Sequence, residues 1–254
     1  MHLPEIDKFS HLKSPLHSWD PRVKIISILT LIFSVVLVQD LRGALPGIAV
    51  AFILLFLSRI PFSFVFLHLR WVLLFLGVFC LIICLTVPGS FLVKFGFLHV
   101  SREGIELSAL VSLRAISAVI LIFPMIGTTR FNLTLKALQT MKVPDKLIQL
   151  LMFSYRYIFL FLDEGQMMFV AATSRGWTKK TRFSTLKTMA NLVGMLLVQS
   201  FERTEKIKDA MLSRGYSGKI NVIDDFNLHP ADFVKACLIM ACAITLHFSG
   251  WIIA

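Results

Sequence analysis

Charged residues are scarce in this sequence, and their scarcity excludes an ordinary soluble domain. Only 16% of the 254 residues are charged, whereas 56% are hydrophobic and 23 are phenylalanines. A typical soluble domain carries about 25% charged residues. The apolar residues form long blocks, while a soluble core would interrupt them with polar residues every few positions. The composition therefore indicates an integral membrane protein with several helices that cross the bilayer.

Cysteines and clusters of metal ligands are also sparse. The four cysteines lie in apolar runs, where a thiol behaves as a small hydrophobe, so no disulfide framework is expected. Cys80 and Cys84 are one helical turn apart, but no further ligands converge on them. His2, His11 and His17 share no single helical face, and no carboxylate is grouped with them. We therefore predict no metal site in this chain.

Three signatures of other functions are missing. The chain contains no Gly-x-x-x-x-Gly-Lys-[Ser/Thr] pattern, so it cannot hold nucleotide phosphates in that way. Its formal net charge of +11 is not accompanied by a basic arm with interleaved aromatics, which argues against a nucleic-acid partner. The N-terminus has Glu5, Asp7 and no early apolar core, unlike a cleaved signal peptide. We expect no cofactor bound by this chain.

The basic residues are distributed unevenly along the chain. Of the 26 Lys and Arg residues, 15 fall between Arg130 and Lys219. Positive charge beside membrane spans marks the cytoplasmic face, because basic loops resist translocation. We therefore predict that residues 130–230 lie inside the cell.

The apolar blocks predict an all-α integral membrane protein with about five transmembrane helices and additional amphipathic cytoplasmic helices. The N-terminus is then cytoplasmic and the C-terminus lies outside. The spans are expected near 23–38, 44–57, 71–87, 108–128 and 236–254. The predicted segments are a cytoplasmic N-terminal segment at 1–22, a four-span region at 23–128, a cytoplasmic helical region at 129–230 and a final transmembrane helix at 231–254.

One segment leaves this topology open. Residues 147–162 are apolar enough to span, but a span there would export a basic loop, so we expect a helix against the inner face. Residues 88–107 are mixed in character and indicate the start of another helix near their end. Arg114 is expected near the outer end of the fourth span, where it can snorkel or meet Glu106.

A polar stretch before the first span is typical of a helix start at the membrane interface. Asp20 can cap the helix, and Pro21 suits its first position. Arg22 and Lys24 oppose the helix dipole, so we expect both to reach lipid phosphates at the headgroup level. Trp19 is expected to mark the same interface. These residues are predicted to anchor the chain at the membrane surface.

One short pattern occurs twice in the long polar stretch, each time with an alanine three residues before its serine. Glycine can adopt the left-handed conformation that ends a helix, the following ring can pack back, and arginine then projects from the C-terminus. Its five donors can pair with a carboxylate on a partner. A single copy is an ordinary helix stop, but two matched copies favour paired docking. The copies are Ser174-Arg175-Gly176-Trp177 and Ser213-Arg214-Gly215-Tyr216.

This pair of motifs resembles the transmembrane T component of energy-coupling factor (ECF) importers, the EcfT/CbiQ family. Its members end their cytoplasmic coupling helices with two Ala-Arg-Gly-like motifs, and here Ser174 and Ser213 stand where alanine is usual. The resemblance extends to Asp20-Pro21-Arg22 with Lys24 and to residues 164–176, so it covers most of the chain. The N-terminal approach is most similar to the CbiQ branch for cobalt or nickel.

The resemblance implies a non-catalytic subunit of the bacterial or archaeal inner membrane, with residues 129–230 as a coupling-helix region. Two ATP-binding cassette ATPase subunits would bind ATP and Mg²⁺ and receive the two arginines. A separate substrate-binding S component, CbiM-like and with or without a CbiN-like subunit, would select the substrate. A shared T component of a vitamin importer is the main alternative within the family.

Two other classes of function are less well supported. A membrane enzyme acting on lipid-linked substrates should gather carboxylates near the bilayer, but adjacent Asp163 and Glu164 project about 100° apart on a helix. Asp224-Asp225 falls in a loop-like stretch. A self-contained secondary transporter should place polar groups in mid-membrane, and the spans offer little besides Arg114. We therefore expect a transporter subunit without catalytic residues.

Overall fold

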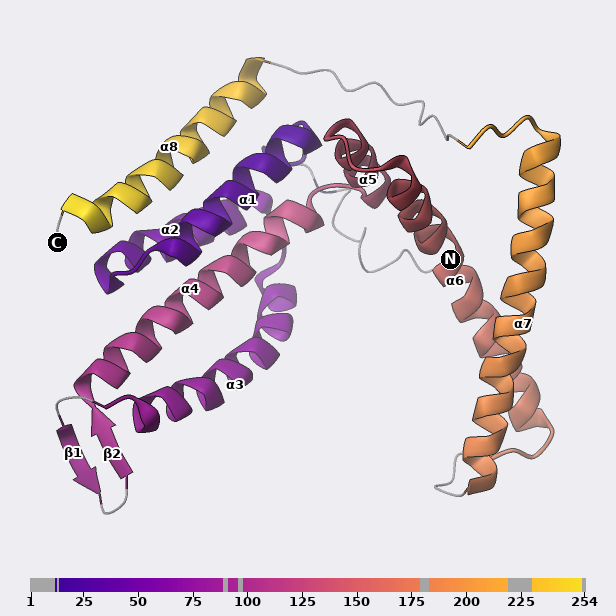
Figure 1. The fold of residues 1–254 in the computed structure, drawn as a ribbon, viewed down its shortest axis with the longest axis horizontal. Coiled ribbons are helices and arrows are strands. Elements are labelled where there is room, and N and C mark those ends of the chain that lie inside the picture. The colour runs from indigo at the N-terminus through magenta and orange to yellow at the C-terminus, as the bar shows by residue number, and fades with distance from the viewer. Residues whose placement is uncertain are drawn as a thin grey trace. The chain divides into compact units, whose positions relative to one another are not determined.

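The computed structural model describes residue 12 and residues 14–88, 91–95, 98–178, 183–218 and 230–252. Two compact units make up the chain. Unit 1 comprises residues 1–137 and 225–254, and unit 2 comprises residues 138–224. Each unit is described by itself below (Figure 1).

Unit 1 is built from helices and one short hairpin. The helices are α1 (Pro21–Leu37), α2 (Leu41–Ser58), α3 (Phe62–Thr86), α4 (Arg102–Gly127), the first part of α5 (Phe131–Thr140) and α8 (Pro230–Ile252). The hairpin joins β1 (Phe91–Phe95) to β2 (Leu98–Ser101). Unit 2 contains the end of α5 and the two longest helices, α6 (Asp145–Ser174) and α7 (Phe183–Ser213).

Helix α4 forms the centre of unit 1. It packs against α1, α2 and α3, and α8 covers α1 and α2 (Figure 1). The shared core is mainly apolar, with a few polar side chains such as Lys24 and Ser117 buried beside it, and many large apolar side chains elsewhere on these helices point outward, as expected of helices that face lipid. The most deeply buried core side chains include Ile28, Leu31, Val35, Leu55, Ile120 and Leu121.

The all-α membrane fold is confirmed, apart from the short hairpin. Within the described residues, three helices are long and apolar enough to cross a bilayer: Phe62–Thr86, Arg102–Gly127 and Pro230–His247. Gly43–Ser58 forms a shorter apolar helix. Helix α1 has 17 residues, a rise of about 26 Å against a hydrocarbon core of about 30 Å. Five spans with alternating sides stay a prediction.

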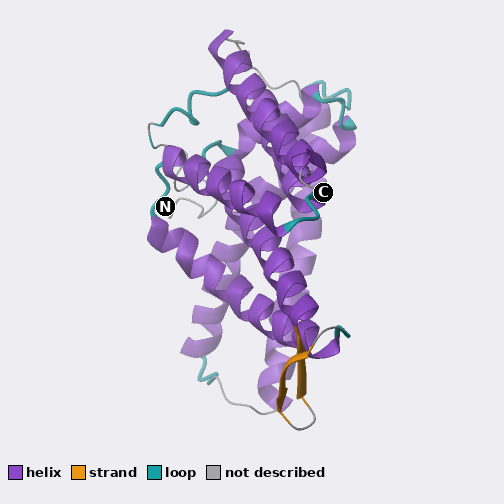
Figure 2. Ribbon diagram, turned by 90° about the vertical axis from the view of Figure 1, so that its left-hand side faces the viewer, coloured by secondary structure: helices purple, strands orange, loops and turns teal. Residues whose placement is uncertain are grey.

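The segment between α3 and α4 differs from the sequence interpretation, because it holds the antiparallel pair β1 and β2 (Figure 2, orange). Ser101 then starts α4: its hydroxyl oxygen accepts a hydrogen bond from the Gly104 amide at 3.0 Å and donates to the Val87 carbonyl at 2.7 Å. Helix α4 is therefore longer than the apolar block from which its span was predicted.

The longer α4 changes the position of Arg114. The residue lies near the middle of the helix and not near one end, since α4 runs from Arg102 to Gly127. Glu106 pairs with Arg102 at 3.3 Å, one turn before it, so the expected meeting with Arg114 is wrong. The Arg114 Nε atom is buried and has no hydrogen-bond partner among the residues that the structure describes.

The start of α1 is capped as predicted but is buried more deeply than predicted. The Asp20 Oδ1 atom accepts from the Arg22 amide at 2.9 Å, and Pro21 occupies the first turn. Trp19 is only 2% exposed, and Lys24 only 1%. Both side chains therefore lie inside unit 1, where neither can reach lipid headgroups.

Lys24 bonds to the end of α4. Its ammonium donates to the Thr128 hydroxyl at 2.9 Å and to the Thr129 hydroxyl at 2.8 Å. A buried charged donor is costly unless it is hydrogen-bonded, and the two threonines supply that compensation. The predicted contact of Lys24 with lipid phosphates is therefore wrong, and the residue joins two helices instead.

Candidate functional site

The two repeated motifs lie at opposite ends of one helical hairpin in unit 2. Helices α6 and α7 are antiparallel and cross each other (Figure 1). The end of α7 returns to the beginning of α6, where the Tyr216 hydroxyl donates to the Gln149 Oε1 atom at 2.6 Å. The Gln149 amide in turn donates to the Gly218 carbonyl at 2.8 Å. The structure thus separates the two arginines and does not gather them into one site.

The first motif ends α6 as the sequence predicts. Gly176 has φ = +86°, the left-handed conformation that glycine adopts at low cost. Its amide donates to the Thr173 carbonyl at 3.0 Å, and the Trp177 amide donates to the Ala172 carbonyl at 3.1 Å. These two hydrogen bonds form a Schellman cap, which satisfies carbonyls left free at a helix end.

The second motif forms the same two capping hydrogen bonds. Gly215 has φ = +80°, its amide donates to the Leu212 carbonyl at 3.0 Å, and the Tyr216 amide donates to the Met211 carbonyl at 3.0 Å. The matching sequence therefore encodes two matching helix ends. Arg175 and Arg214 occupy equivalent positions in them, and both side chains are exposed.

The two serines are accommodated within their own helices. The Ser174 hydroxyl donates to the Val170 carbonyl at 3.0 Å, and the Ser213 hydroxyl donates to the Asp209 carbonyl at 3.0 Å. Each bond runs four residues back along the helix, as is usual for a helical serine. The hydroxyl that distinguishes these motifs from an alanine version therefore bonds to its own helix, and the arginine stays exposed.

The two aromatic residues after the glycines have different surroundings. The Trp177 ring lies 6.1 Å from the Phe169 ring, so it packs back on α6 as predicted. The Trp177 Nε1 atom is buried without a hydrogen-bond partner in the described part of the chain. Tyr216 instead uses its hydroxyl to hold Gln149 on the other helix. The two helix ends thus share a backbone but differ in how the ring is held.

A cleft of about 520 Å³ lies beside the first motif, between α6 and α7. Apolar side chains make most of its wall, and Arg175 is among the residues that line it. This open, largely apolar cleft offers no set of convergent polar groups of the kind that a small-molecule site needs. The lining residues are Met168, Ala171, Ala172, Arg175, Gly176, Trp177, Thr188, Leu192 and Met195.

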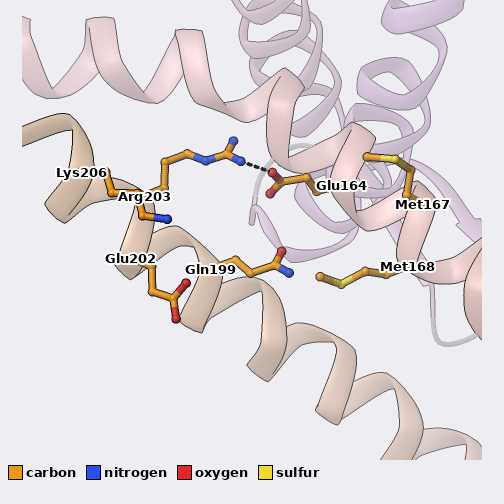
Figure 3. A pocket seen from close by; sticks show the side chains of 7 residues that line it. All are labelled: Glu164, Met167, Met168, Gln199, Glu202, Arg203 and Lys206. Carbon is orange, nitrogen blue, oxygen red and sulfur yellow. Dashed lines mark hydrogen bonds and ion pairs between the residues drawn. The ribbon is translucent and has the colours of Figure 1, made fainter. Parts of the chain in front are cut away.

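A second cleft, of about 420 Å³, lies farther along the same hairpin. Glu164 and Arg203 form an ion pair across it and point directly toward each other (Figure 3). Both side chains are partly buried, with 15% of Glu164 and 34% of Arg203 exposed. The lining residues are Glu164, Met167, Met168, Gln199, Glu202, Arg203 and Lys206.

Sequence reasoning missed three of these residues. It places Gln149 in an apolar segment and Glu164 on a solvated surface, and it gives Arg203 no role. One signal was present, because Glu164 and Arg203 have the same separation along the chain as Arg175 and Arg214. The spacing of the repeat therefore points to the ion pair.

The structure shows no grouping of side chains typical of metal binding within the described ranges. No three His, Cys, Asp or Glu side chains come together there as metal ligands would. The Cys80 thiol pairs with the Ser112 hydroxyl at 2.8 Å, and the His17 ring pairs with the Ser14 hydroxyl at 2.6 Å. His2 and His11 lie outside the described residues.

Comparison with known proteins identifies the family. Residues 12–222 match the family model of CbiQ, described as a cobalt transport protein. The chain is 32% identical over 225 residues to the energy-coupling factor transporter transmembrane protein EcfT of Macrococcus caseolyticus, covering 84% of each protein. It is 30% identical to EcfT of Bacillus subtilis, again over 84% of each. An uncharacterized protein of Methanocaldococcus jannaschii is 26% identical over 96% of this chain and 86% of its own length. The chain therefore belongs to the CbiQ/EcfT family, the transmembrane T components of energy-coupling factor transporters.

Proposed function

We propose that this T component transmits motion from two separate ATPase subunits to a separate substrate-binding membrane subunit. Arg175 and Arg214 are the docking contacts, and each enters one ATPase subunit. The observation that carries the proposal is the pair of equivalent helix ends, each with an exposed arginine at the same position of a Schellman cap. A coupling device that engages two alike partners needs two alike contacts.

The spacing of the two helix ends suits two partners better than one. Glu164 pairs with Arg203, and each arginine lies 11 residues beyond that pair along its own part of the chain. At 1.5 Å per residue, the two ends are separated by up to about 33 Å along the hairpin. A globular domain of about 150 residues has a radius of gyration near 15 Å and a diameter of roughly 40 Å. The two arginines can therefore meet two neighbouring subunits.

The chemistry of the two ends suits a carboxylate-lined groove. A guanidinium beside a helix C-terminus is favoured by the helix dipole and offers a rigid fork of donors for a carboxylate. The positive charge of residues 130–219 supports a cytoplasmic location for unit 2, where ATPase subunits have access to ATP and Mg²⁺. In this proposal the chain is a multi-pass protein of the cell membrane, and unit 2 carries the coupling helices.

The cargo we propose is cobalt or nickel. The description of the matched family, a cobalt transport protein, supports this choice, while the names of the EcfT relatives specify no substrate. Selection then belongs to a CbiM-like S component, with or without a CbiN-like subunit. Cells that express the whole complex should accumulate Co²⁺ or Ni²⁺ under ATP-dependent conditions. Uptake of a vitamin with no metal uptake would instead assign the chain to a vitamin importer.

Charge reversal at both arginines tests the docking role. The double variant Arg175→Glu, Arg214→Glu should lose the copurifying ATPase subunits and transport, because removing one partner of a desolvated charge pair costs about 2–5 kcal/mol. Lys187→Glu with Lys208→Glu is the matched control, since both lysines are exposed on α7, away from the lining of the Glu164–Arg203 cleft, and the net charge changes equally. Normal copurification and uptake in the double arginine variant would contradict the docking role.

A further inference from the structure

The α6–α7 hairpin repeats more than its two caps. Glu164 lies 11 residues before Arg175, and Arg203 lies 11 residues before Arg214. The shift along the chain that maps Arg175 onto Arg214 therefore also maps Glu164 onto Arg203. In two antiparallel helices, positions related by this shift run in opposite directions along the hairpin. A position and its equivalent can therefore be in direct contact at only one height. The Glu164–Arg203 ion pair marks that level (Figure 3).

Related positions of the two helices also lie near each other on either side of the ion pair. On one side, the hydroxyl of Tyr216 holds Gln149 of the opposite helix. The same shift relates Trp177 to Tyr216 and Gln149 to Thr188, and both Trp177 and Thr188 line one cleft on the other side. The ring after each glycine thus lies near an equivalent residue of the other helix. The hairpin has an approximate twofold axis that passes through the ion pair.

We propose that Glu164 and Arg203 are positioning residues that fix the hairpin at this axis. They hold two arms of equal length, each about 16 Å from the ion pair to its arginine at 1.5 Å per residue. The arms then present Arg175 and Arg214 symmetrically to a partner with twofold symmetry. This proposal rests on the proposed docking function, and it assigns the hairpin centre a role that the docking residues do not supply.

The charges of the two positions suit a contact on the axis. A strict repeat would place like charges opposite each other, whereas a carboxylate and a guanidinium attract. Both groups are partly buried, so solvent screens their attraction less than that of a surface pair. The Glu164 Oε2 atom is buried and has no further hydrogen-bond partner within the described ranges. The carboxylate therefore depends on Arg203.

A contact on the axis can persist while the arms rotate. Groups at a pivot are displaced little by a change in crossing angle, whereas the helix ends are displaced most. Beside the pair, the Leu196 side chain lies close to Gly165, 3.7 Å from the place where a Cβ would be. Leu196 is seven residues before Arg203 on α7, so packing supports the crossing within about two turns of the ion pair. The ion pair can keep the helices together in two arrangements of a coupling element.

The test uses the complete complex, purified with its ATPase and S subunits. Spin labels at Thr173→Cys and Leu212→Cys, in a variant whose four native cysteines are replaced, report the distance between the helix ends. Glu164→Gln should leave ATPase copurification intact but broaden this distance distribution. It should also raise severalfold the ATP hydrolysed per substrate transported in proteoliposomes. Glu202→Gln, an exposed neighbour in the same cleft, is the matched control and should change neither.

The charge swap Glu164→Arg with Arg203→Glu distinguishes positioning from simple stabilisation. It should restore both the narrow distance distribution and the coupling ratio, because the two positions are equivalent about the axis. A normal distribution and ratio in Glu164→Gln, or a swap that restores neither, would overturn the positioning role. The docking function would instead be refuted if ATPase binding did not depend on Arg175 and Arg214. A broadened distance distribution in Glu164→Gln would then still support the role of the ion pair as a pivot.

Discussion

Basic side chains at helix ends are buried in one unit of this protein and exposed in the other. In unit 1, Lys24 near the start of α1 is 1% exposed and bonds to Thr128 and Thr129. In unit 2, Arg175 and Arg214 at the ends of α6 and α7 remain exposed. A buried cation that finds its acceptors inside its own unit serves the fold. A cation held outward by a rigid cap is available to another molecule.

The largest expected effect lies in unit 1. The double variant Thr128→Val, Thr129→Val removes both hydroxyl acceptors of a buried ammonium, and bonds to charged groups contribute about 1.5–3 kcal/mol each. We expect a loss of about 3 kcal/mol or more, measured as a lower midpoint of thermal unfolding in detergent. Adding Lys24→Met should recover much of the loss, because the uncompensated charge is then gone. No recovery would mean that Lys24 does not depend on these threonines.

A smaller effect is expected at the two capping glycines of unit 2. Gly176 and Gly215 have positive φ, and no atom lies within 4 Å of the place where a Cβ would be. Substitution by alanine therefore costs only the backbone strain of the left-handed conformation, about 1 kcal/mol at each position. Gly176→Ala and Gly215→Ala should weaken ATPase copurification modestly and to similar extents. A large effect at one position alone would show that the two ends are not equivalent.

The smallest effect is expected at the two serines of the motifs. Ser174→Ala and Ser213→Ala remove hydroxyls that bond only within their own helix, and alanine has the higher helix propensity. The free energy of unfolding should change by less than about 0.5 kcal/mol, as for ordinary surface substitutions. Transport should stay close to that of the unchanged protein. A marked loss of uptake would instead indicate that the hydroxyls contact a partner.

Local sequence rules predicted the helix ends well and tertiary contacts poorly. The Asp20 cap and both Arg-Gly-aromatic stops follow from the backbone preferences of single residues, and the structure contains them. The burial of Lys24 could not be predicted, since its acceptors lie more than a hundred residues away at the end of α4. Amphipathic side chains near an apolar block fit either lipid headgroups or a neighbouring helix, and only packing decides between them.

The centre of the α6–α7 hairpin shows a different limit of prediction from sequence. The spacing of the repeat was visible in the motifs, but its extension to Glu164 and Arg203 involves residues of opposite charge that no similarity search for a repeat would match. The antiparallel pairing of α6 with α7 makes the correspondence apparent. The sequence analysis missed the β1–β2 pair between α3 and α4 for a simpler reason. Its strands are short, and residues nearby carry a strong helix-start pattern.

The most direct test of the account compares the two single variants Arg175→Glu and Arg214→Glu. The affinity of the purified ATPase subunits for the T component in lipid nanodiscs would be measured for each, alongside the unchanged protein and the double variant. Equivalent docking contacts predict that each single variant weakens binding by about 30-fold or more, at 1.4 kcal/mol per tenfold, and by similar factors. Wild-type affinity in either single variant would contradict paired docking.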